Sequence, residues 1–218
     1  MKKILLIGDS IRWQYFPRVK EALKEVAMVY TNDDSARYSV HTLRYLDEWK
    51  RVGNIPDDID IVHWNVGAWD ILHMYGDKDP LTSLMEYKHN IERIDKALRK
   101  IYPKAQLVFA PITAIKDHRF TEPEYYYRLN SDAQAYNGVA LEVLKDTDTI
   151  INDLYLITKD LPDEYYADGV HFSEELGVPY ISQAVIKKLC EVGKIEVSKI
   201  KNIESVTTEK QDASVFGR

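Results

Sequence analysis

The stretch Ile4-Leu5-Leu6-Ile7-Gly8-Asp9-Ser10, near the start of the chain, decides the fold. Four consecutive apolar residues followed by glycine are typical of a short strand that is buried on both faces, as in a parallel sheet. The polar residues after such a strand lie at the carboxyl end of the sheet, where open α/β proteins collect their ligand-binding groups. The stretch therefore predicts a parallel sheet with a serine at its functional edge.

The same pattern recurs along the chain. Further strand-like runs occupy residues 27–30, 59–65, 107–110 and 149–151. Segments of helical periodicity occupy residues 18–25, 43–52, 84–102, 133–144 and 180–192. Strands that alternate with helices predict a single α/β domain: a three-layer, doubly wound, five-stranded parallel sheet with helices on both faces, in the flavodoxin-like order 2-1-3-4-5.

The composition is that of an ordinary globular protein. Of the 218 residues, 45% are hydrophobic and 29% are charged, which excludes collagen-like, disordered and disulfide-rich classes. The net charge of −6 argues against a nucleic-acid partner, which normally requires a basic surface. Cys190 is the one cysteine, so an intrachain disulfide and a cysteine-rich metal site are excluded, and we expect neither a metal ion nor another cofactor.

No stretch of the sequence reads as a membrane or export signal. The apolar run of residues 4–7 is shorter than the ~7–15 residues of a signal-peptide core, and no later run approaches the ~18 residues of a membrane span. We therefore expect a cytoplasmic protein without a membrane partner. Residues 1–193 form the predicted domain and residues 194–218 a polar C-terminal tail, while no pattern indicates an oligomeric state.

Ser10, Asp168 and His171 are predicted to meet at the carboxyl edge of the sheet. Only Gly169 and Val170 separate Asp168 from His171, and this turn can bring the carboxylate to the imidazole Nδ1–H while Nε2 stays free for Ser10. A serine, a histidine and a carboxylate are the groups of a nucleophilic acyl-transfer site. Structural roles explain the same residues, with Ser10 as a helix N-cap and Asp-Gly as an ordinary turn.

Other chemistries of this fold class lack their motifs. No Gly-x-Gly-x-x-Gly or Walker sequence follows a strand, so the phosphate cradle of nucleotide-binding sheets is missing. The Gly-x-Ser-x-Gly elbow of α/β-hydrolases is also missing. Cys190 lies among apolar neighbours in a predicted helix, which is typical of a buried structural thiol.

Gly8-Asp9-Ser10 after the first strand and Asp168-Gly169-Val170-His171 before the last helix resemble the SGNH/GDSL hydrolase superfamily, in particular its small bacterial esterases. Residues 60–70 are similar to the third-strand block of this family, and the resemblance covers residues 1 to about 192 in the expected order. It implies that Ser10 is the nucleophile, His171 the general base and acid, and Asp168 the partner that orients the histidine.

Two departures from the family pattern concern the oxyanion hole. The glycine that usually follows the second strand has no counterpart here, so a backbone N–H near Ser35 or Ala36 would have to serve. The family's Gly-x-Asn-Asp reads Gly67-Ala68-Trp69-Asp70, so the usual asparagine is replaced. Asn65, at the strand end, and the indole N–H of Trp69 are the substitute donors that we predict.

The resemblance implies hydrolysis of short-chain acyl esters, O-acetyl esters of carbohydrates above all, through an acyl-serine intermediate. The expected partner is a small-molecule or oligosaccharide ester, whose hydroxyl groups Arg37 and the run Tyr125-Tyr126-Tyr127 can bind, although a solvated surface explains these residues equally well. Three alternatives stay open: a catalytically silent carbohydrate- or nucleotide-binding module on the same fold, a flavodoxin-like binding or signalling domain, and a lysophospholipase or thioesterase.

Overall fold

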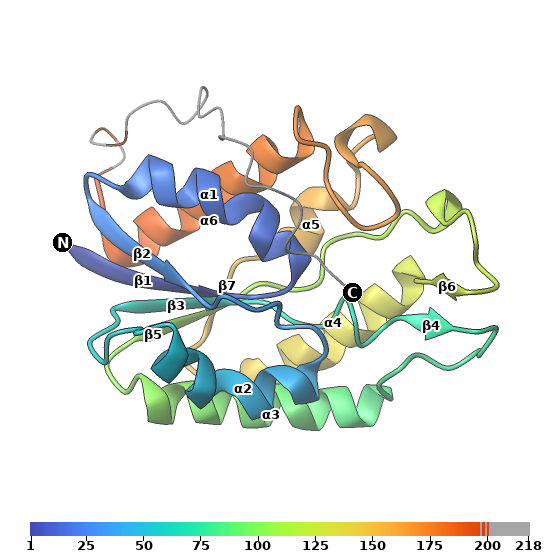
Figure 1. The fold of residues 1–218 in the computed structure, drawn as a ribbon, viewed down its shortest axis with the longest axis horizontal. Coiled ribbons are helices and arrows are strands. Elements are labelled where there is room, and N and C mark those ends of the chain that lie inside the picture. Colours follow the sequence, from blue (N-terminus) through green and yellow to red (C-terminus); the bar gives the residue numbers. More distant parts are fainter. Residues whose placement is uncertain (197, 199, 201–218) are drawn as a thin grey trace.

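The computed structural model describes residues 1–196, 198 and 200. Within this part, the main sheet has five parallel strands in the order β2-β1-β3-β5-β7 (Figure 1). They are β1 (Lys2–Ile7), β2 (Ala27–Thr31), β3 (Ile61–Trp64), β5 (Gln106–Phe109) and β7 (Ile150–Ile151). Counted along the chain this is the order 2-1-3-4-5, so the predicted doubly wound α/β fold is confirmed.

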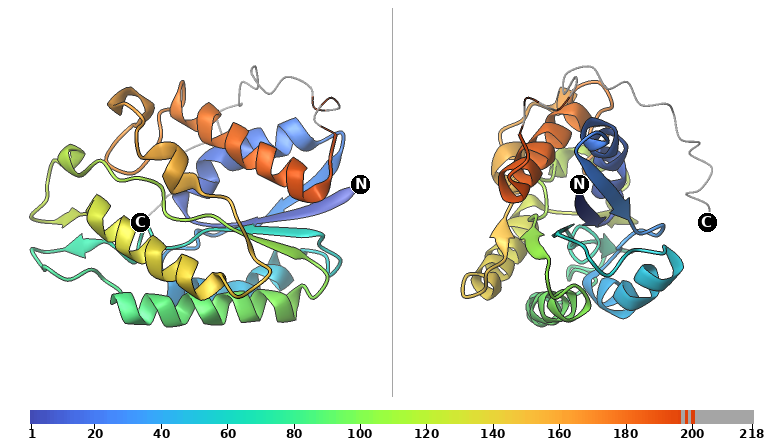
Figure 2. Two further views of the ribbon diagram at one scale, coloured as in Figure 1. Left: turned by 180° about the vertical axis from the view of Figure 1, so that it is seen from behind. Right: turned by 90° about the vertical axis from the view of Figure 1, so that its left-hand side faces the viewer.

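Helices cover both faces of the sheet and form the outer two layers (Figure 2). One face carries α1 (Ser10–Leu23) and α6 (Gly177–Gly193), and the other carries α2 (Ser39–Val52), α3 (Leu84–Ile101) and α4 (Asn130–Leu144). Short helical turns occupy α5 (Leu154–Thr158), η1 (Asp117–Arg119) and η2 (Asp163–Tyr165).

The first helix begins earlier than predicted. The helical periodicity predicted a start at residue 18, after Pro17, but α1 starts at Ser10 and contains Pro17. Pro17 lacks the N–H that would donate to the preceding turn. A well-formed N-terminus supports the longer helix, because the Asp9 side chain caps it by accepting a hydrogen bond from the Ile11 N–H at 3.0 Å.

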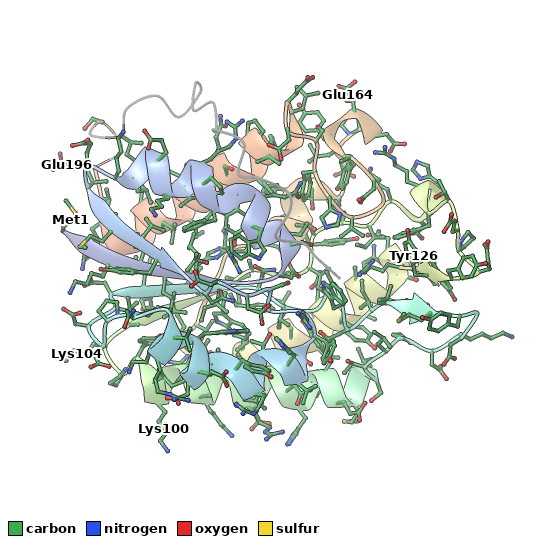
Figure 3. All side chains as sticks on the ribbon, viewed as in Figure 1. Met1, Lys100, Lys104, Tyr126, Glu164 and Glu196 are labelled. Carbon is green, nitrogen blue, oxygen red and sulfur yellow. The ribbon has the colours of Figure 1, made fainter. Side chains whose placement is uncertain are left out.

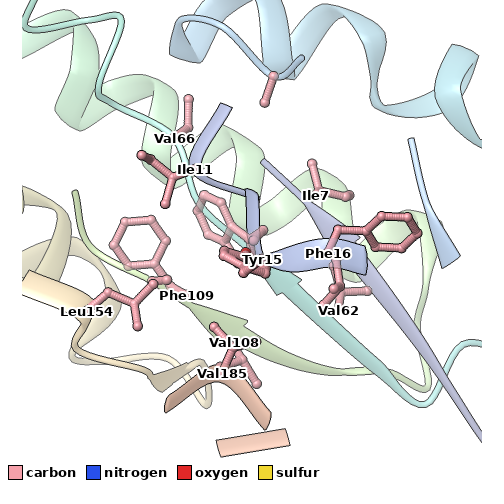
Figure 4. Packing of buried hydrophobic residues seen from close by; sticks show 14 of the residues in the cluster. Ile7, Ile11, Tyr15, Phe16, Val62, Val66, Val108, Phe109, Leu154 and Val185 are labelled. Atoms are coloured by element: carbon pink, nitrogen blue, oxygen red, sulfur yellow. The ribbon is translucent and has the colours of Figure 1, made fainter. Parts of the chain in front are cut away.

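The core lies on the two faces of the central strands. Ile4, Leu5, Val62 and Phe109 are fully buried because helices cover the strands from both sides. The close-up in Figure 4 shows Ile11 and Tyr15 of α1 and Val185 of α6 among the core side chains. Lys100, Lys104 and Glu164 are among the charged side chains that lie at the periphery (Figure 3).

A two-stranded arm projects beyond the carboxyl edge of the main sheet (Figure 1). We define the arm as β4 (His73–Met74) and its antiparallel partner β6 (Tyr126–Tyr127). Tyr127 stacks on His73 with ring centroids 4.5 Å apart, and His73 Nε2 lies 2.8 Å from Asp132 Oδ2. Strands of two residues leave no periodicity in a sequence, which is why the sequence analysis placed no strand here.

The predicted tail, residues 194–218, lies mostly outside the described residues. The division of the chain at residue 193 therefore stays a prediction. Among the residues that the structure does describe, no helix combines the length and the apolar character that a membrane crossing requires.

Candidate active site

Ser10 is the first residue of α1, directly after the Gly8-Asp9 turn that leaves β1. Asp9, not Ser10, caps the helix, so the structural role considered for Ser10 is wrong and its hydroxyl is available for another partner. Gly8 is needed for this turn, because a Cβ there would lie 2.0 Å from Asn65 Oδ1. The Ser10 N–H lies at the helix N-terminus, where N–H groups have no acceptor within the helix.

Ser10, His171 and Asp168 form a continuous hydrogen-bonded chain. Ser10 Oγ lies 2.7 Å from His171 Nε2, and His171 Nδ1 lies 2.7 Å from Asp168 Oδ2. With its ring proton on Nδ1, the histidine donates to Asp168 and its Nε2 can accept the proton of the serine hydroxyl. The structure therefore brings together the three residues that the sequence analysis predicted to converge.

The turn around Gly169 sets the orientation of this carboxylate. Asp168 Oδ1 accepts hydrogen bonds from the backbone N–H groups of Val170 and His171, both at 2.7 Å. Partial burial would raise the pKa of the Asp168 carboxyl, but the hydrogen bonds from the His171 ring and from these N–H groups hold that pKa well below its usual range. Asp168 is consequently ionised wherever the protein is folded at ordinary pH.

Gln14, one helical turn after Ser10, joins α1 to the histidine loop. Its side-chain amide donates to the Phe172 carbonyl at 2.8 Å and accepts from the Phe172 N–H at 3.0 Å. The same helix thus carries the serine and holds the residue that follows His171, which keeps the two reacting groups at a fixed separation.

The loop after β2 hydrogen-bonds to the end of β1, two residues before Ser10. The expectation that the Ser35 or Ala36 N–H serves as an oxyanion donor is wrong. The Ser35 N–H donates to Asp34 Oδ1 at 2.7 Å and the Ala36 N–H to the Gly8 carbonyl at 2.9 Å, so neither is free to stabilise an oxyanion. The next residue, Arg37, has a φ of 44°, a left-handed conformation that favours glycine. Arg37 thus has a glycine-like backbone conformation. It lies in the loop after the second strand, where the SGNH/GDSL pattern usually has a glycine.

The side chain of Arg37 extends toward solvent. Its guanidinium lies 3.7 Å from Asp34 Oδ1, and about half of the side chain is exposed, at 49%. Beneath the loop, the fully buried Arg12 donates to the carbonyls of Gly8 at 3.1 Å and Asp34 at 2.7 Å. Arg12 therefore ties the loop to the end of β1.

The loop after β3 supplies Asn65, Gly67 and Trp69. Gly67 has a φ of 131°, and a Cβ there would lie 2.6 Å from Ile112, so the turn requires glycine. Asn65 is buried and its amide nitrogen donates to Asp9 Oδ1 at 2.9 Å, so the structure directs this group to the helix cap rather than to Ser10. Trp69 is half-buried, and no described residue accepts a hydrogen bond from its indole N–H.

Asp70, the residue after Trp69, anchors this loop. Its carboxylate accepts hydrogen bonds from the Ser39 N–H at 2.9 Å and the Ser39 hydroxyl at 2.6 Å, at the start of α2. Burial raises the pKa of Asp70 to about 6, against the effect of these hydrogen bonds. Asp70 therefore has a structural role in placing Trp69.

Sequence reasoning missed Arg128, which lies between the arm and α4. Its Nε donates to the Ala68 carbonyl, in the turn between Gly67 and Trp69. Burial lowers the pKa of the Arg128 guanidinium to about 10, against the opposing charges of Asp9 and Asp168. Arg128 reaches the site through its contact with Ala68, which lies 60 residues earlier in the sequence. A single arginine in a loop carries no pattern that predicts such a contact.

A small cavity of about 10 Å³ opens at the same edge of the sheet. Asp9 and Ile11, the two chain neighbours of Ser10, both line it, whereas Ser10 itself does not. Its apolar walls are Ile11, Val66, Ala68, Ile112 and Leu154. A space of this size admits about one water molecule.

The comparisons with known proteins agree with this architecture. No family model and no curated protein sequence matches the chain. Among solved structures, a lipase/acylhydrolase from Enterococcus faecalis is 21% identical with a TM-score of 0.69, over 90% of this chain and 98% of that one. A GDSL-like lipase from Bacteroides thetaiotaomicron is 15% identical with a TM-score of 0.65, over 89% of each chain.

An acetyl xylan esterase, AlAXEase, is 14% identical with a TM-score of 0.68, over 86% of this chain and 99% of that one. At such low identity the likeness shows the fold alone. The chain therefore shares the fold of these structures, one of which is named a GDSL-like lipase, and the fold that the sequence resemblance implied is confirmed.

Proposed function

We propose that this protein is a serine esterase of the SGNH type, which hydrolyses short-chain acyl esters, chiefly O-acetyl esters of carbohydrates. The observation that carries this proposal is the chain of two 2.7 Å contacts from Ser10 through His171 to Asp168. A structural serine at a helix start does not require a histidine at hydrogen-bond distance, or a carboxylate behind it.

The reaction follows from the positions of these three groups. Ser10 Oγ attacks the ester carbonyl while His171 Nε2 takes its proton, and the resulting imidazolium protonates the departing alcohol. The acyl-serine then reacts with a water molecule that His171 deprotonates; the bond from Ser10 Oγ to the acyl carbon breaks, the imidazolium returns its proton to Ser10 Oγ, and the carboxylic acid leaves. Asp168, ionised throughout, stabilises the imidazolium in both steps.

The oxyanion hole is proposed to contain the Ser10 N–H, the Arg37 N–H and the indole N–H of Trp69. The Ser10 N–H lies at the positive end of the α1 dipole, where it favours developing negative charge. The Arg37 N–H has a weak contact, with Ser35 Oγ at 3.5 Å, in a loop that hydrogen-bonds to Gly8. Trp69 is favoured over Asn65 because the Asn65 amide already donates to Asp9.

Trp69→Phe is expected to lower kcat for p-nitrophenyl acetate about 10²–10³-fold with little change in KM, the effect of removing one oxyanion donor. Trp64→Phe is the matched control, because it deletes the indole N–H of a core tryptophan with no hydrogen-bond partner. A normal kcat in Trp69→Phe together with a similar loss in Asn65→Ala would assign the role to Asn65.

The acyl group is proposed to be short because the cavity beside Ser10 is small. Each added methylene gains about 0.8 kcal/mol only where apolar space receives it, so kcat/KM is expected to fall from acetyl to butyryl to octanoyl p-nitrophenyl esters.

Ile112→Ala removes part of the cavity wall and is expected to raise the ratio of butyryl to acetyl hydrolysis about tenfold.

Ile94→Ala is the control for that ratio, since Ile94 is fully buried in α3 and does not line the cavity. It is expected to lower stability by about 2–5 kcal/mol without changing the preference. Efficiency that rises toward octanoyl in the wild type would instead indicate a lysophospholipase or thioesterase.

A carbohydrate alcohol fits the aromatic residues around the arm. Tyr125 and Tyr126 are 54% and 47% exposed, and flat aromatic faces are suited to stacking on sugar rings. One of the structures that share the fold is named an acetyl xylan esterase. Acetate release from acetylated sugars tests the proposal, and inactivity on every ester would favour a silent binding module.

A further inference from the structure

Arg128 is a cation that forms no ion pair at the candidate active site, although the charges of Asp9 and Asp168 lie near enough to act on it. Its Nε donates to the Ala68 carbonyl, but no described residue accepts a hydrogen bond from either of its terminal nitrogens. No carboxylate of the described part lies within ion-pair distance of it either. Arg119, which also lies near the site, differs because its two terminal nitrogens donate to the carbonyls of Asp163, Tyr166 and Ala167.

Such an arrangement is unfavourable in the free protein. A guanidinium that has lost part of its hydration normally regains the energy through a carboxylate or several carbonyl groups. The Arg128 guanidinium is protonated at neutral pH, and its terminal nitrogens are not sealed from solvent, since neither is among the buried polar atoms without a partner. A group from outside the chain can therefore reach them.

The location of Arg128 connects it to the substrate. Ala68, which accepts its Nε hydrogen bond, lines the small cavity beside Ser10. The residues just before it on the chain form β6 of the arm, with the exposed Tyr126 (Figure 3). Arg128 thus lies between the proposed acyl cavity and the proposed platform for the alcohol.

We propose that Arg128 binds a carboxylate or phosphate group on the alcohol part of the ester, so that the site prefers acylated acidic sugars or other anionic alcohols. The inference rests on the proposed esterase function and names its substrate class. With Nε held by Ala68, the two terminal nitrogens form a planar pair that matches the two oxygens of such an anion.

The kinetic test compares esters that differ in charge. The neutral substrate is 4-acetoxybenzamide, and the anionic substrates are 4-acetoxybenzoate and 4-acetoxyphenyl phosphate. The wild type is expected to prefer an anionic ester about tenfold or more in kcat/KM. Arg128→Gln is expected to lose about 10–100-fold on the anionic esters, the effect of a charge-assisted hydrogen bond, and less than about threefold on the amide.

Arg44→Gln is the matched control, because Arg44 lies on the exposed face of α2 in a pair with Glu48. Arg44→Gln is expected to leave kcat/KM unchanged for both the neutral and the anionic esters. Of the two anionic esters, the one that responds more to Arg128→Gln identifies the preferred anion. An equal loss on the neutral and anionic esters would show that Arg128 acts on the oxyanion or on loop structure, and would overturn the proposal, as would the absence of a charge preference.

A binding measurement separates this inference from the esterase proposal. Calorimetry with the Ser10→Ala variant compares 4-hydroxybenzoate, phenyl phosphate and 4-hydroxybenzamide, none of which requires turnover. Binding of an anion that is stronger than that of the amide, and is lost in Ser10→Ala/Arg128→Gln, supports the anion site even if the wild type hydrolyses no ester. Equal binding of the three compounds contradicts the site, whatever the activity.

Discussion

Ser10→Ala is expected to lower kcat/KM for p-nitrophenyl acetate at least about 10⁴-fold, a larger loss than that expected for Asp168→Asn. The reason is the loss of the attacking oxygen itself, after which only binding and oxyanion stabilisation remain. The fold is expected to be unaffected, because Asp9 rather than Ser10 caps α1. Steady-state kinetics and a thermal melt measure the two quantities separately.

Ser83→Ala provides the opposite control. Ser83 is a helix N-cap, and its hydroxyl forms a capping box with Glu86 at the start of α3. Its replacement is expected to lower the free energy of unfolding by about 1 kcal/mol and to leave kcat unchanged. If Ser10→Ala behaved like Ser83→Ala, with reduced stability and normal turnover, Ser10 would be a structural residue and the proposed mechanism would be wrong.

Asp168→Asn is expected to lower kcat about 10²–10⁴-fold, a smaller loss than that of Ser10→Ala. The asparagine amide can turn its nitrogen toward His171 Nδ1 and so favour the ring tautomer whose Nε2 carries a proton. That tautomer cannot accept the proton of Ser10. The nucleophile remains, and an imidazole in the correct orientation for part of the time retains some activity.

The surface pair of His118 and Asp163 is the matched control for Asp168→Asn. His118 Nε2 lies 2.6 Å from Asp163 Oδ2, with both side chains more than half exposed. Asp163→Asn removes the same kind of carboxylate–imidazole contact and is expected to leave kcat unchanged. Equal activity of the wild type and Asp168→Asn would show that this carboxylate does not orient the histidine.

Much of the fold and the convergence of Ser10, Asp168 and His171 could be predicted because both depend on local patterns. A buried strand has a short apolar run, and the run that ends at Gly8 fixes where Ser10 stands on the sheet. Asp168 and His171 are joined by a single turn, so their contact needs no long-range information. The order of strands then brings the end of β1 and the loop before α6 to the same edge of the sheet.

The surroundings of these residues were less predictable because they depend on contacts between distant segments. The Ala36 N–H is taken by the Gly8 carbonyl, which removed one expected oxyanion donor. Asn65 is turned toward Asp9, and Arg37 adopts a left-handed conformation that its residue type does not favour. The pairing of β4 with β6 and the contact between Arg128 and Ala68 also join segments about 50–60 residues apart, without a periodic signal.

The most direct test of the central claim is the reaction of the full chain with a fluorophosphonate, followed by mass spectrometry of the peptides. Such a reagent phosphonylates a serine only where a neighbouring base activates it. The wild type is expected to gain one phosphonyl group on Ser10, His171→Ala to react far more slowly, and Ser10→Ala to gain none. A folded wild-type protein that remains unmodified at Ser10, or that is labelled equally fast without His171, would contradict the assignment of Ser10 as an activated nucleophile.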